Sequence, residues 1–156
     1  MYAFLEGPAL LEDKFSWIHV LKYIEKMHSN SFVHGDLLPR NFIFDKQSAC
    51  GWVINFDLTR KVDSVYVNGY NHQSFVFFRH KDAKAGLKMK TEHDVHFLKQ
   101  LSKSYFGLKD EAIDEVENVS DLISFFERDE FEISNSEGWH DDITPSVATT
   151  NSPIRE

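Results

Sequence analysis

Three polar residues in one short loop have the types and spacing needed for phosphoryl transfer to a hydroxyl. His34, Asp36 and Asn41 form the pattern H-x-D-x-x-x-x-N. A carboxylate at Asp36 would accept the proton of an attacking hydroxyl, and the Asn41 amide oxygen would reach a metal ion on the phosphates. Pro39 lies between them, fixes its own φ and stiffens the loop.

Two apolar runs follow this loop and predict a β-hairpin. Residues 42–44 and 51–54 are apolar or glycine, and the polar residues 45–48 between them suit a turn. The second run leads directly into Asn55-Phe56-Asp57. In an extended backbone the side chains of Asn55 and Asp57 point the same way, so either could face a metal ion near the loop.

The loop and hairpin together resemble the C-terminal lobe of the protein-kinase-like superfamily, in its divergent, fungal-type form. The resemblance implies ATP and Mg²⁺ as cofactors, with Asp36 and Asn41 as catalytic residues. It also implies that Asn41, Asn55 and Asp57 bind the metal and the nucleotide. The family keeps an Asp where Asn55 stands, and a neutral amide there removes one negative charge from the metal site.

Two helices are predicted to position these residues, and the expected fold class is α+β and mainly helical. Residues 13–29 have an apolar face at helical spacing, and a second helix is expected from residue 91 to about residue 106. A short helix should run from residue 120 or 121 to residue 126. By resemblance, Asp94 should be buried and hold the catalytic loop, whereas Asp36 should be exposed in a cleft.

The resemblance covers residues 1–128, which we expect to be a kinase-like C-lobe without its N-lobe. None of the seven glycines are spaced as G-x-G-x-x-G, and no strand lysine of the family's type precedes the first helix. Residues 1–5 match the strand at the hinge between lobes. Residues 129–156 are polar and acidic, and we expect them to be a disordered tail.

Charge and cysteine content limit the classes of partner. The net charge is −8, and residues 109–156 carry 14 acidic and 3 basic residues. An acidic end disfavours nucleic acid and anionic membranes as partners. Cys50 is the only cysteine, and no apolar run approaches the roughly 20 residues that span a bilayer. We therefore expect an intracellular, cytoplasmic protein.

Three functions remain open. The first is ATP-dependent phosphoryl transfer to a protein Ser or Thr hydroxyl, weak or absent in the isolated chain because the N-lobe is missing and Asn55 replaces an Asp. The second is a non-catalytic pseudokinase interaction module. The third is a small-molecule phosphotransferase of the aminoglycoside or choline type, which shares the sequence His34-Gly35-Asp36. The expected partners are a protein substrate or a chain that supplies an N-lobe.

His93 and His96 lie one helical turn apart and could be interpreted as a metal-binding pair. No third ligand is placed beside them by the sequence. We therefore expect a packing or surface role for both. His34 is likewise expected to be structural, because the family packs this histidine beneath the aromatic residue that corresponds to Phe56.

Overall fold

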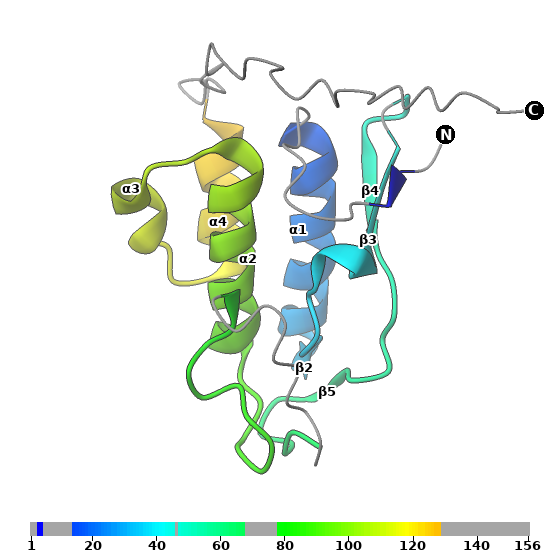
Figure 1. Ribbon diagram of the computed structural model, residues 1–156, viewed down its shortest axis with the longest axis vertical. Helices are drawn as coiled ribbons and strands as arrows, with labels where there is room; N and C mark the ends of the chain where they lie inside the picture. Colours follow the sequence, from blue (N-terminus) through cyan, green and yellow to red (C-terminus); the bar gives the residue numbers. More distant parts are fainter. Residues whose placement is uncertain (1–2, 5–13, 46, 68–77, 129–156) are drawn as a thin grey trace, which may run out of the picture.

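Three helices and one hairpin make up most of the fold. The computed structural model describes residues 3–4, 14–45, 47–67 and 78–128. Helix α1 (Lys14–Ser29) lies between the hairpin of β3 (Phe42–Asp45) and β4 (Cys50–Val53) and the helices α2 (Thr91–Phe106) and α4 (Val119–Glu127), as Figure 1 shows. The architecture is α+β, as the sequence predicted.

Smaller elements complete the described part of the chain. They are β1 (Ala3–Phe4), β2 (Phe32–Val33), the 3₁₀ helix η1 (Pro39–Asn41), β5 (Arg60–Lys61) and α3 (Asp110–Asp114). Strand β1 pairs antiparallel with β3, which makes a three-stranded sheet of order β1-β3-β4. Strand β2 pairs antiparallel with β5. The loop of residues 34–41 therefore leaves β2 and leads through η1 to β3 in the three-stranded sheet.

Helix α1 is the centre of the main core because its apolar residues recur at helical spacing. Trp17, Leu21 and Ile24 are fully buried. The Trp17 indole packs edge-on against the rings of Phe42 and Tyr105, with centroids 5.6 and 5.3 Å away. One side chain of α1 thus joins the hairpin to α2.

Strand β4 can approach α1 closely only because Gly51 has no side chain. A Cβ at this position would collide with the backbone carbonyl of Ser16 and with the Val20 side chain. The position faces Phe44 across the hairpin. This glycine therefore sets the distance between the hairpin and the helix, and with it the place where the chain enters Asn55.

A second, smaller core lies under the segment that follows the hairpin. It contains the buried residues Val33, Tyr66, Ala83 and Met89. The backbone amides of residues 63 and 66 donate to the carbonyls of residues 89 and 87, so two stretches of this segment run together as an irregular ribbon. This core packs the segment against Val33, directly before the loop of residues 34–41.

The sequence predicted the long elements well and the short ones poorly. The helices predicted over residues 13–29 and 91–106 are observed at 14–29 and 91–106, and the second is ended by Gly107 at φ 61°. The predicted start of the last helix, at residue 120 or 121, was wrong. The helix begins at Val119, because the Asn118 side chain accepts the Asp121 amide as its N-cap.

Some expectations fall on parts of the chain that the structure does not describe. The proposed tail, residues 129–156, lies outside the described residues, as does most of the strand expected over residues 1–5. Helix α3 was not predicted at all. No helix in the described ranges has the length and apolar character required to cross a bilayer.

A buried hydrogen bond between α1 and α2 gives the first prediction. The Trp17 Nε1–H group donates to the Ser102 hydroxyl at 2.9 Å, and Ser102 is fully buried. The Ser102→Ala variant leaves that indole N–H without its partner, so we expect it to lose about 1–3 kcal/mol of unfolding free energy. Urea denaturation followed by tryptophan fluorescence would measure the loss.

The matched control for this prediction is Ser104→Ala. Ser104 lies on the same helix and is only partly buried, so both variants gain the same helix propensity. Its stability should stay within about 0.5 kcal/mol of the unaltered chain. Equal stabilities for the two variants would show that the indole bond does not join α1 to α2.

Candidate functional site

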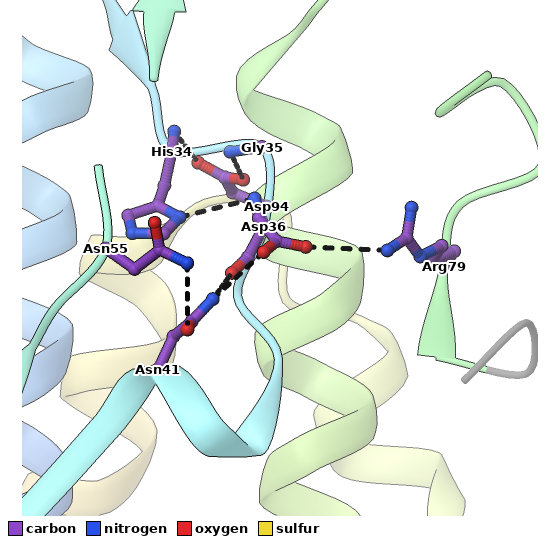
Figure 2. Close-up of polar contacts among 7 residues, drawn as sticks. All are labelled: His34, Gly35, Asp36, Asn41, Asn55, Arg79 and Asp94. Atoms are coloured by element: carbon purple, nitrogen blue, oxygen red, sulfur yellow. Dashed lines mark hydrogen bonds and ion pairs between the residues drawn. The ribbon is translucent and has the colours of Figure 1, made fainter. Parts of the chain in front are cut away.

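The Asp94 carboxylate holds the start of the loop of residues 34–41. It lies in the first turn of α2 and is 2% exposed. The backbone amide of His34 donates to its Oδ2 at 2.8 Å, and that of Gly35 donates to its Oδ1 at 3.0 Å (Figure 2). Two successive amides of an irregular loop thus obtain a buried acceptor. The burial and anchoring expected of Asp94 are confirmed.

A histidine on α1 makes a third contact with the same carboxylate, which the sequence did not predict. His28 Nε2 lies 3.0 Å from Asp94 Oδ2 and is nearly buried. Helices α1 and α2 are thereby joined beneath the loop. The nearest sequence signal was the position of His28 in the last turn of its helix, which carries no information about a partner 66 positions away.

His34 is a packing residue, as the sequence predicted. Its ring is fully buried and lies 5.3 Å from the Phe56 ring, centroid to centroid. Burial lowers the pKa of His34, against the opposing effect of the carboxylates of Asp94 and Asp36. The neutral ring uses Nδ1 to accept the Asp36 backbone amide at 3.2 Å. The buried His34 ring therefore supports the conformation of the loop.

Gly35 is required by the backbone conformation of the loop. Its φ is 76°, in the left-handed region that side chains disfavour. An added Cβ would also meet the end of the Met89 side chain. Glycine therefore suits the central position of His34-Gly35-Asp36 better than a residue with a side chain. The turn at Gly35 leads the chain from the contacts with Asp94 to Asp36.

The side chains of Asp36 and Asn41, the last residue of η1, point toward one another, as Figure 2 shows. The Asn41 Nδ2 group donates to the Asp36 backbone carbonyl at 2.6 Å and to its Oδ2 at 3.0 Å. Pro39 begins η1, which brings the two residues together. The expectation that Asp36 would be exposed was wrong: it is 6% exposed.

Arg79 contacts the buried carboxylate of Asp36, and the sequence did not predict this contact. The Arg79 Nη2 atom lies 3.5 Å from Asp36 Oδ1, and both side chains are largely buried. Figure 2 shows the guanidinium approaching from a segment on the far side of the carboxylate from Asn41. The only signal in the sequence was a basic residue at this position, and that signal does not name a partner.

Asn55 adjoins the loop, and Asp57 does not. The Asn55 Nδ2 group donates to Asn41 Oδ1 at 3.3 Å. Asn55 has φ 63°, and asparagine is among the residues that adopt this conformation most readily. The Asp57 side chain is exposed, and its backbone carbonyl accepts the Arg60 guanidinium. The structure thus groups Asp36, Asn41 and Asn55.

The side chains in this group do not fit Mg²⁺ in their present arrangement. Amide oxygens suit a hard cation, but the NH2 group of Asn55 occupies the Asn41 oxygen that would bind it. Rotation of the Asn55 amide would present an oxygen, still without a charge. In the described ranges no three His, Cys, Asp or Glu side chains are grouped to hold a metal ion.

Comparisons with known proteins agree with a kinase-like fold. No family model matches the sequence. Two curated proteins of Encephalitozoon cuniculi (strain GB-M1), probable cell division control protein 7 homologs 1 and 2, are each 42% identical over 57 residues. Those residues are 36% of this chain and 16% of either relative.

A solved structure extends the likeness over most of the chain. The Cydia pomonella granulovirus kinase, PK-1, superposes with a TM-score of 0.50 and 17% identity. The match covers 81% of this chain and 48% of the viral kinase, so the chain spans about half of that protein's length. The fold is protein-kinase-like.

The anchoring contacts give the second prediction. Asp94→Ala leaves two buried backbone amides and His28 without their acceptor. Asp36→Ala removes a carboxylate contact from Asn41 and from Arg79. Asn41 keeps the backbone carbonyl of residue 36 as an acceptor. At about 1–3 kcal/mol for each stranded donor, Asp94→Ala should destabilise the chain more. Urea midpoints for the two variants would measure the difference.

Asp57→Ala is the control for both substitutions, because Asp57 is exposed and its side chain is not part of the bonded group. It should change stability by less than about 0.5 kcal/mol. A larger loss for Asp36→Ala than for Asp94→Ala would contradict the role of Asp94 as the anchor.

Proposed function

We propose that this chain is the C-lobe of a protein-kinase-like domain that transfers a phosphoryl group from ATP to a protein Ser or Thr hydroxyl. One observation carries the proposal: Asp36 and Asn41 meet in a loop whose backbone is fixed by Asp94. The kinase-like fold and the partial likeness to cell division control protein 7 homologs support a kinase-like function.

Asp36 is the residue that acts on the acceptor. A carboxylate accepts a hydroxyl proton best when it is held within hydrogen-bond reach of the nucleophile. Asn41 binds one carboxylate oxygen, and Arg79 lies beside the other. The carboxylate is therefore fixed on both sides, and an incoming hydroxyl must displace or share the Arg79 contact to reach Oδ1.

Asn55 makes this chemistry weak. ATP arrives as its magnesium complex, and the metal neutralises charge on the phosphates. The Asn55 amide brings no negative charge, and its NH2 group is bonded to Asn41. A second lobe, on a longer form of this protein or on another chain, would cover the nucleotide. We expect little or no transfer by this chain alone.

A non-catalytic interaction module is the second candidate, and the Asn55 bond favours it. The bond joins the two amides where the family binds metal, so the loop is stable without an ion. Such a protein would keep the fold and its partner surfaces while losing transfer. No contact among the described residues favours a small-molecule acceptor.

The third prediction separates the two candidates through the metal site. The unaltered chain should bind ATP·Mg²⁺ weakly, with a Kd above about 10 μM by thermal shift. Asn55→Asp is nearly the same size and places a carboxylate beside Asn41, so we expect it to tighten Mn²⁺- and Mg²⁺-dependent nucleotide binding by about tenfold or more. Labelled phosphate transfer to casein or histone should rise with it.

Two further variants serve as controls in the Asn55→Asp background. Asp36→Asn should remove about 10²-fold or more of the transfer and leave nucleotide binding intact. Asp57→Asn should change neither, because the Asp57 side chain is exposed and is not part of the hydrogen-bonded group of Asn41 and Asn55. Tight binding without Asp36-dependent transfer would overturn the catalytic proposal in favour of the interaction module. Loss of binding in Asp57→Asn would show that Asp57 is the metal ligand.

A further inference from the structure

The segment that carries Arg79 is fastened to helix α2 by three histidine rings. His80 stacks on His93 with centroids 4.9 Å apart and nearly parallel planes, and it meets His96 edge-on at 5.4 Å. The neighbouring Phe78 ring stacks on Phe97 at 5.9 Å. All three contacts run between residues 78–80 and one face of α2, so they dock this segment on the helix.

The hydrogen bonds of the cluster suit neutral rings. The Asp82 backbone amide donates to His80 Nδ1 at 3.2 Å, which requires that nitrogen to carry no proton. The Tyr66 hydroxyl lies 3.0 Å from His93 Nδ1 and donates to it in the tautomer that leaves this nitrogen bare. His93 itself is only 4% exposed, so a charge there would be poorly hydrated.

Burial works against protonation of His93, and the carboxylates near the cluster, including Asp82 at 3.9 Å from His80 Nδ1, favour it. Burial lowers the pKa of His93, and His80 lowers it further, whereas Asp94, Glu92 and Asp82 oppose this. Arg79, which is positively charged, lines the same small cavity as His93.

His96, half-buried on the same helix, has the same bias. Burial lowers the pKa of His96 most, followed by His80, Lys99 and Lys103, and Asp114 alone opposes them. Both histidines therefore bind protons less readily in the closed cluster than when the segment is released.

The sign of the pH dependence follows from linkage. A histidine whose pKa is lowered in the closed state binds more protons in the open state, so closure is favoured as pH rises. The stability of closure is fully present above the ordinary histidine pKa of about 6.5. It is lost as pH falls below that value, toward the lowered pKa values of His93 and His96.

We propose that His80, packed on His93 and His96, forms a proton-sensitive latch, which holds Arg79 against Asp36 when the rings of His93 and His96 are neutral and releases it when those two rings gain protons. The latch is a property of the fold and is independent of catalysis. Its consequence for transfer rests on the proposed function: Arg79 positions Asp36 Oδ1 while the latch is closed.

Proton NMR of the full chain tests the latch directly. Cross-relaxation between the rings of Phe78 and Phe97 reports whether the segment is docked, and that between Trp17 and Tyr105 reports whether the main core is intact. Between about pH 7.5 and pH 5, we expect the first signal to disappear and the second to remain. The loss should coincide with the titration of His93 and His96, each below the ordinary histidine pKa.

Variants make the test specific to the cluster. His96→Phe keeps a flat ring and cannot be charged, so its Phe78–Phe97 signal should be lost at a lower pH than in the unaltered chain. His93→Phe provides a second test if His96→Phe does not fold. His19→Gln is the control, because His19 contacts the Gly51 carbonyl on the hairpin and should leave the transition unchanged.

Three results would overturn the proposal. They are a Phe78–Phe97 signal that survives in the unaltered chain while His93 and His96 titrate, loss of the Trp17–Tyr105 signal in the same transition, and an unchanged transition in both phenylalanine variants. Because no readout here needs ATP, a working latch without transfer would count against the proposed function alone.

Discussion

The buried carboxylate of Asp94 is the contact on which the candidate site depends. A short loop without regular structure must satisfy its backbone amides, and here two successive amides, those of His34 and Gly35, bind one side chain of α2. Since α2 packs against the main core, the loop takes its position from the helix bundle. His28 extends the contact to α1.

A continuous set of hydrogen bonds leads from this anchor to the polar residues of the candidate site. His34 accepts the Asp36 amide, Asn41 binds the Asp36 carboxylate, and Asn55 binds Asn41. The anchor and the carboxylate have the features of a kinase-like loop, whereas the last bond joins two neutral amides. The same arrangement thus holds the Asp36 carboxylate in place and puts no second negative charge beside it.

The parts of the site that the sequence predicted are those set by local spacing. The five-position separation of Asp36 and Asn41 spans one 3₁₀ turn, and helical periodicity located α1 and α2. Asp94 was found by resemblance. Arg79 was missed because its distance from Asp36 depends on how the intervening chain packs, and the expected exposure of Asp36 was wrong for the same reason.

Hydrogen exchange of the His34 and Gly35 backbone amides tests the central claim most directly. Both amides belong to a loop, yet each donates to a buried carboxylate. They should therefore exchange only when the whole chain unfolds, as slowly as the core of α1. Exchange at the rate of an unstructured peptide in the folded chain would contradict the account, because the loop would then not be held by Asp94.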